Sequence, residues 1–133
     1  MNDEYDQMVH TTTKEKSNKL EQIVELSLLY DFYGALLKEN QREIFEDYIL
    51  NDLSLSEIAE GKNMTRQGIY DIIKRCSKLL VNYEEKLSLI HKFDETKEMV
   101  NQINQAAKDI RKTGDITQIQ EIERLSFQIL DEF

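Results

Sequence analysis

Residues 53–80 read LSLSEIAEGKNMTRQGIYDIIKRCSKLL, and the caps, turn and apolar positions of this segment predict the central part of the structure. Ser54 and Glu57 have the spacing of a capping box, which predicts that a short helix begins beside them. The Gly-Lys-Asn run at residues 61–63 tolerates a left-handed backbone and ends that helix, and the hydroxyl of Thr65 caps the next one. The stretch therefore predicts two helices joined by a tight turn.

The second of these helices has one apolar face and one polar face. Apolar side chains recur at helical spacing in Ile69, Ile72, Ile73, Cys76 and Leu80. The candidate nucleic-acid-binding residues lie away from this stripe: Arg66, Gln67, Tyr70, Lys74, Arg75 and Lys78. Two helices of this kind match the helix-turn-helix that presents its second helix to the DNA major groove. An ordinary helical hairpin with solvated lysines is the alternative.

Each candidate side chain suits a particular contact. Gln67 fits a bidentate hydrogen bond to adenine, and Arg66 or Lys74 reaches guanine or a phosphate. Arg75 and Lys78 would hold the DNA backbone. These residues therefore combine base reading with phosphate binding.

The overall charge limits how strongly such a protein binds nucleic acid. The chain of 133 residues has 26 Asp and Glu against 17 Lys and Arg, a formal net charge of −9. Phosphate neutralisation supplies most non-specific affinity, so this balance argues against strong non-specific binding. Tyr70 packs on a thymine methyl group or bonds a phosphate, while Asp71 accepts from cytosine but costs affinity beside phosphates. The helix-turn-helix is a mildly basic region that permits weak DNA binding.

Four separated motifs resemble those of the YlxM family. They are LYDFY at residues 29–33, DLSLSEIA at 52–59, TRQGIYDIIKR at 65–75 and YEEKL at 83–87. They follow the family's order, and the resemblance covers residues 20–93. It implies a small bacterial protein with a helix-turn-helix like region 4 of the housekeeping sigma factors. It also implies a regulator or a participant in the signal recognition particle pathway, because the family's genes neighbour those of that particle.

Composition and periodicity predict an all-α protein with three parts. Proline is absent and there are only four glycines. Residues 1–19 lack apolar periodicity and are expected to form a disordered extension. Residues 20–93 are expected to form a helix-turn-helix bundle, and the family resemblance implies that it is similar to sigma factor region 4. Its recognition helix is expected to extend without a break through Ile90 on a heptad pattern. Residues 94–133 are expected to form a helical hairpin packed on that domain.

Two amphipathic patterns define the expected hairpin. The first helix carries Met99, Ile103, Ala107 and Ile110, and the second carries Ile119, Ile122, Ile129 and Leu130. Thr113 and Gly114 end the first helix, and Asp115 with Gln118 caps the second. The two helices are expected to run antiparallel.

Residues 20–37 are apolar on more than one face. One stripe holds Leu26, Tyr30, Tyr33 and Leu37, and another holds Leu28, Leu29, Phe32 and Leu36. A small domain rarely buries both sides of an outer helix, so this helix or the heptad helix is expected to form a homodimer interface. Enclosure of the helix within its own domain is the alternative.

The sequence lacks the patterns of a catalytic, metal or membrane protein. His10 and His91 have no suitably spaced cysteine or carboxylate companions, so neither predicts a metal site. No glycine-rich phosphate loop or nucleophile elbow is present, which predicts neither enzyme activity nor a cofactor. No apolar run is long enough for a membrane span. Cys76 is the only cysteine and is expected to be a core residue in a cytoplasmic protein.

Two functions follow from these residues and from the resemblance. The first is a DNA-binding regulatory protein, which the turn, the caps and the outward polar residues favour. The second is a module that binds a protein or the RNA of the signal recognition particle without reading DNA sequence. The acidic balance favours this alternative.

Overall fold

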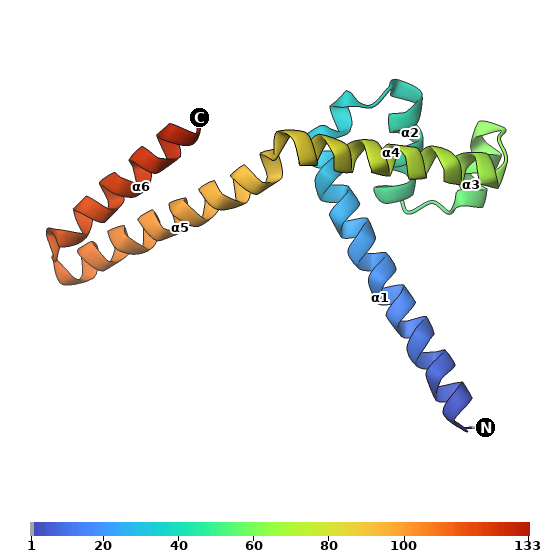
Figure 1. Ribbon diagram of the computed structural model, residues 1–133, viewed down its shortest axis with the longest axis horizontal. Helices are drawn as coiled ribbons and strands as arrows, with labels where there is room; N and C mark the ends of the chain where they lie inside the picture. The colour runs from blue at the N-terminus through green and yellow to red at the C-terminus, as the bar shows by residue number, and fades with distance from the viewer. Residues whose placement is uncertain (1) are drawn as a thin grey trace. The chain divides into compact units, whose positions relative to one another are not determined.

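The computed structural model describes the backbone of residues 2–133 and the side chains from Asn18 onward. Every regular element in this range is helical, which confirms the all-α class (Figure 1). The elements are α1 (Asn2–Tyr33), η1 (Gly34–Leu36), α2 (Glu39–Ile49), α3 (Leu55–Lys62), α4 (Arg66–Leu87), α5 (Leu89–Thr113), η2 (Ile116–Gln118) and α6 (Ile119–Glu132). They form two compact units, one ending at Leu87 and the other spanning Ser88–Phe133.

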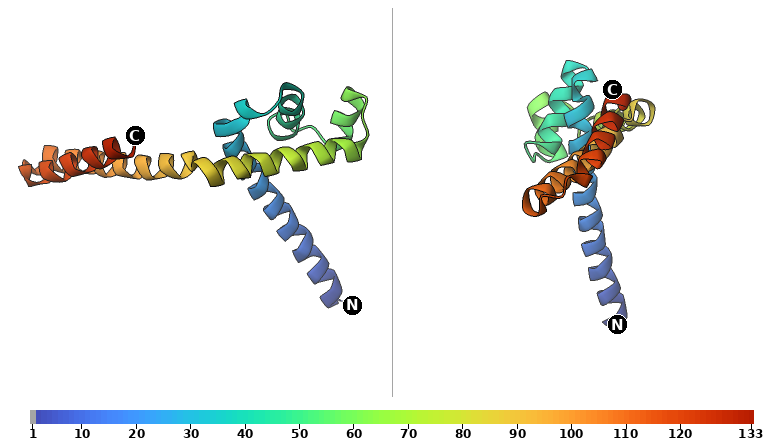
Figure 2. Two further views of the ribbon diagram at one scale, coloured as in Figure 1. Left: turned by 45° about the horizontal axis from the view of Figure 1, so that its top comes forward. Right: turned by 90° about the vertical axis from the view of Figure 1, so that its left-hand side faces the viewer.

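The core of the first unit is built around α4. This helix packs against α1, α2 and α3, and Figure 2 shows α1 crossing it. The buried side chains of α4 are Ile69, Ile73, Cys76 and Leu80. They meet Leu29 and Tyr33 from α1, Ile44, Phe45 and Ile49 from α2, and Ile58 and Ala59 from α3. The apolar stripe expected for the second helix of the motif is thus confirmed. Cys76 is a core residue, as expected, and its burial raises the pKa of its thiol.

Two tyrosines hold the end of α1 in this core. The Tyr33 hydroxyl donates to Glu84 Oε1 of α4 at 2.5 Å, and its ring lies 6.0 Å from that of Tyr83. The Tyr30 hydroxyl donates to a carboxylate oxygen of Glu46 in α2. These contacts fix the direction in which α1 leaves the bundle.

The capping chemistry at α3 is as the sequence predicts. Ser54 Oγ accepts from the Glu57 amide at 3.1 Å, and the Ser54 amide donates to Glu57 Oε1 at 3.3 Å. Asn63, with φ of 54°, ends α3 in the left-handed region. Gly61 and Lys62 remain helical, so the asparagine alone supplies the left-handed backbone expected of the three residues.

The start of α4 agrees with the sequence prediction, and its end does not. At its start, the Gly68 amide donates to Thr65 Oγ1 at 3.0 Å, as expected of the cap. At its end the prediction of an unbroken helix through Ile90 was wrong: α4 stops at Leu87, and Ser88 has φ of 53°. A serine favours helix interiors less than the neighbouring leucines do, and its left-handed backbone interrupts the heptad pattern.

The first helix is longer than expected. Residues 1–19 were predicted to form a disordered extension, whereas α1 begins at Asn2. This run contains no proline or glycine and so offers nothing that breaks a helix. Side chains before Asn18 lie outside the described residues.

The second unit is the expected helical hairpin, in which α5 and α6 pack against each other (Figure 1). Gly114, with φ of 71°, ends α5, and Asp115 accepts from the Thr117 amide at 3.0 Å in the connection. Whether this unit packs on the first one stays a prediction.

The register of the hairpin differs from the predicted one at several positions. Ala106 is buried beside Met99, whereas Ala107 is exposed. In α6 the buried residue is Leu125, and Ile119 and Leu130 are exposed. The other predicted positions, Ile103, Ile110, Ile122 and Ile129, are half-buried, so the predicted faces hold apart from Ala107, Ile119 and Leu130.

Candidate nucleic-acid interface

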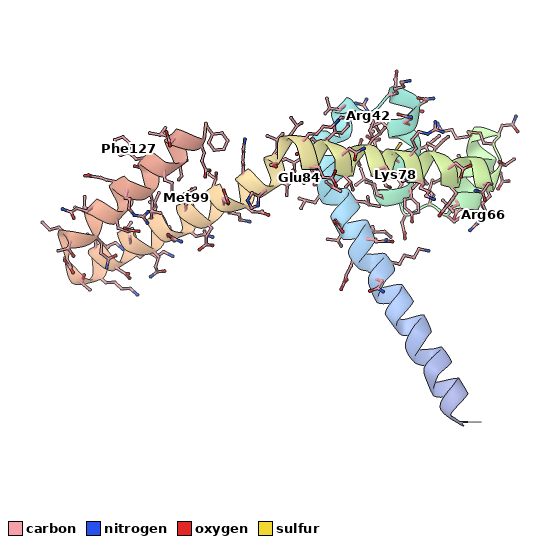
Figure 3. All side chains as sticks on the ribbon, viewed as in Figure 1. Arg42, Arg66, Lys78, Glu84, Met99 and Phe127 are labelled. Atoms are coloured by element: carbon pink, nitrogen blue, oxygen red, sulfur yellow. The ribbon has the colours of Figure 1, made fainter. Side chains whose placement is uncertain are left out.

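The six predicted contact residues all lie on the exposed surface of α4. Tyr70, the most apolar of them, is 46% exposed. Arg66, Gln67, Lys74, Arg75 and Lys78 are also exposed. Figure 3 labels Arg66 in the first turn of α4 and Lys78 further along the helix. The structure therefore leaves this face free of the protein's own core.

A groove of about 920 Å³ runs along this face between α1 and α4. Five of the six predicted residues line it, and Arg75 does not. Its other wall is α1, which contributes Lys19, Gln22, Glu25, Leu26 and Leu29. Tyr48 of α2 and Leu55 of α3 also line it. The exposed face of α4 is thus one side of a concave surface.

The groove combines a basic rim with an apolar floor. Lys19, Arg66, Lys74 and Lys78 carry positive charge, against Glu25 as the carboxylate among the lining residues. The floor includes the buried side chains of Leu29 and Ile73. Cations held beside a low-dielectric surface attract an anionic partner more strongly than isolated surface charges do.

Two contacts within the protein already engage polar groups that a nucleic acid could otherwise bind. Gln67 Nε2 donates to Asp71 Oδ1 one turn later at 3.0 Å, which uses one of the two N–H groups of this amide. Lys62 Nζ lies 2.9 Å from Glu43 Oε2, a contact that lowers the pKa of the carboxyl and raises that of the amine. The lysine at the end of α3 is therefore already paired.

Metal-binding clusters and membrane-spanning helices are both absent from the part of the chain that the structure describes. Within that part, no group of three or more His, Cys, Asp or Glu side chains is arranged to hold a metal ion. None of the helices described here combines the length and the apolar character of a membrane span.

Comparison with known proteins gives the family. A family model described as "Putative helix-turn-helix protein, YlxM / p13 like" (UPF0122) matches residues 20–122. The chain belongs to the UPF0122 family. The family description is that of a helix-turn-helix protein and not of an enzyme, and the resemblance inferred from the sequence motifs is confirmed.

Several UPF0122 relatives match over most of the chain. YlxM of Bacillus subtilis (strain 168) is 42% identical over 107 residues, which cover 80% of this chain and 97% of that protein. A UPF0122 protein of Caldanaerobacter subterraneus subsp. tengcongensis is 52% identical over 80 residues, 60% of this chain and 68% of the relative. One of Acetivibrio thermocellus is 48% identical over 92 residues, 69% of this chain and 76% of the relative.

The α1 wall of the groove is the part of this candidate interface that the sequence did not predict. Lys19, Gln22 and Leu26 recur three and four residues apart, in line with Leu29 and Tyr33. The buried stripe of α1 thus continues toward the N-terminus as a polar stripe on the same face. That continuity was a signal that these residues would face α4.

Proposed function

We propose that this UPF0122 protein binds double-stranded DNA through the exposed face of α4. What carries the proposal is that Arg66, Gln67, Tyr70, Lys74 and Lys78 share one exposed face of the second helix of a capped helix-turn-helix. In such motifs the second helix enters the major groove and the flanking residues hold the backbone. Regulation of transcription is the role that this binding would serve.

The α1 wall extends the proposed contact. Lys19 and Gln22 line the same groove as Lys74 and Lys78, so a duplex seated on α4 would bring a phosphate strand toward them. Phosphate contacts position the protein, while Gln67 and Arg66 would read base edges. The hydrogen bond to Asp71 uses one N–H of the Gln67 amide and leaves the second N–H and Oε1 for a base edge.

Selection from a random duplex pool tests the proposal, because no target sequence is known. The wild type should enrich a sequence at low salt, and Arg66→Ala combined with Lys74→Ala should abolish the enrichment. A matched control is Lys108→Ala with Arg111→Ala, which removes the same two residue types from exposed positions of α5. Loss of the phosphate contact of Lys74 would also lower the slope of log affinity against log salt by about 0.9. Equal enrichment by wild type and the α4 variant would contradict the proposal.

A second candidate is a module that binds a component of the signal recognition particle. The observations that favour it are the net charge of −9 and the apolar floor of the groove, both of which suit a protein partner better than a duplex. Pull-down with the purified particle protein and its RNA separates the two candidates. Retention of either one, without DNA enrichment, would favour this second function.

A further inference from the structure

The outer face of α6 carries an apolar stripe that the hairpin leaves uncovered. Ile119, Phe127 and Leu130 fall on one side of this helix, opposite the buried Leu125. Phe127 and Leu130 are each 73% exposed. A second apolar stripe of this kind predicts another contact surface.

The same face of α6 is acidic. Glu123 lies between Ile119 and Phe127 on the helical wheel, and Asp131 borders the stripe. Arg124, the cation of this helix, is already engaged, because its Nε donates to Glu121 Oε2 at 3.0 Å. The face therefore presents apolar anchors flanked by unneutralised carboxylates.

The groove between α1 and α4 has the complementary chemistry. It offers an apolar floor and the cations Lys19, Arg66, Lys74 and Lys78 against the single lining carboxylate of Glu25. An amphipathic helix laid in such a groove is a recurring recognition mode, with anchors spaced along one helical face. Opposite charge at the rim would fix the orientation of the helix.

We propose that the groove binds α6 of a second copy of this chain. Phe127 and Leu130 would cover the apolar floor, while Glu123 and Asp131 would approach Lys74 and Lys78. The contact joins the groove of one chain to α6 of another, so it closes as a reciprocal dimer or continues as an open chain. It differs from an interface made by the first helix or the heptad helix alone, because the element that enters the groove is α6 of the second chain. It does not depend on DNA binding.

Sedimentation of the full chain at low salt tests this contact. The wild type should show a mass that rises with concentration up to about 100 µM, the range of weak protein contacts. Phe127→Ser with Leu130→Ser should weaken self-association at least about tenfold, which corresponds to 1.4 kcal/mol. The folded core should tolerate the change because both side chains are exposed. A monomeric wild type over this range would overturn the proposal.

A matched control separates α6 from the first helix. Leu20 and Val24 form an exposed apolar pair on α1, 66% and 70% exposed. The double variant Leu20→Ser with Val24→Ser should associate like the wild type. If this variant is monomeric while the α6 variant still associates, the dimer uses α1 and the proposal is wrong.

Charge reversal identifies the groove as the binding site. Lys74→Glu with Lys78→Glu should also weaken association at least about tenfold, and adding Glu123→Lys with Asp131→Lys should restore it. Restoration requires that the two sets of charges meet. Failure of the four-residue variant to regain association, while circular dichroism shows it folded, would overturn the pairing. None of these readouts involves DNA, so a failed DNA selection leaves this inference intact.

Discussion

The hydrogen bond from Tyr30 to Glu46 predicts a loss of stability at alkaline pH. Burial of the ring, together with the carboxylate that accepts from its hydroxyl, raises the pKa of Tyr30 from 10.0 to about 12. The unfolded chain releases this proton near pH 10, whereas the folded chain keeps it until about pH 12. The folded state binds the proton more tightly than the unfolded chain does. The stabilisation that the protonated Tyr30 contributes is therefore fully present below pH 10 and is lost as the pH rises from about 10 to about 12.

The size of the effect follows from the shift. A shift of about two pKa units corresponds to about 2.7 kcal/mol. The Tyr30 side chain is only partly buried, and screening by solvent reduces this to roughly 1 kcal/mol. The substitution Tyr30→Phe removes both the titrating group and the hydrogen bond, so it should also remove this part of the pH dependence.

Urea unfolding followed by circular dichroism measures the effect at about pH 8, 10 and 11.5, which run from below the unfolded-state pKa to just below the folded-state one. The stability advantage of the wild type over Tyr30→Phe should shrink by roughly 1 kcal/mol from the lowest pH to the highest. Tyr70→Phe controls for the loss of a tyrosine hydroxyl at an exposed position. An advantage that stays constant across this range would refute the reasoning, because it would mean that Tyr30 titrates alike in both states.

Three further substitutions test the local structure by thermal or urea unfolding. Gly61→Ala in α3 should stabilise the protein by about 0.5–1 kcal/mol, since an added Cβ meets nothing within 4 Å and the unfolded chain loses freedom. Gly34→Ala should destabilise it by about 1–3 kcal/mol, because the new Cβ would lie 2.5 Å from the ring of Tyr30. Ser54→Ala should cost about 1 kcal/mol through loss of the hydrogen bond from the Glu57 amide. A change of the opposite sign at any of these positions would contradict the packing described for it.

The helix-turn-helix was predictable because its signals are local. Ser54 and Glu57 are three residues apart, and Asn63 and Thr65 act on the backbone beside them. Each of these contacts depends on a few neighbouring residues and on no distant part of the chain. The exposure of the α4 face followed directly, since burying one stripe of a helix leaves the opposite stripe outside.

The groove was not predictable in the same way because it depends on a distant contact. Tyr33 bonds Glu84, which lies 51 residues away, and this contact sets the course of α1 beside α4. Periodicity identifies which residues of α1 share a face but not which helix that face meets. The missed break at Ser88 has a different cause, since a single left-handed residue changes the local backbone without disturbing the apolar pattern around it.

DNA and α6 of a second chain would compete for the groove, because both are anionic and both use Lys74 and Lys78. A second chain that covers these residues reduces the apparent affinity for DNA by the factor 1 + [chain]/Kd, about elevenfold when the chain is at ten times its Kd. Non-specific DNA, whose affinity comes from phosphates alone, would be displaced first. A specific DNA sequence also bonds Gln67 and Arg66 through its base edges, so it binds more tightly than non-specific DNA does. Self-docking lowers the apparent affinity for every duplex by the same factor, so the ratio of specific to non-specific affinity stays the same. Weakly bound DNA loses most of its occupancy, whereas a specific site bound well above saturation stays occupied.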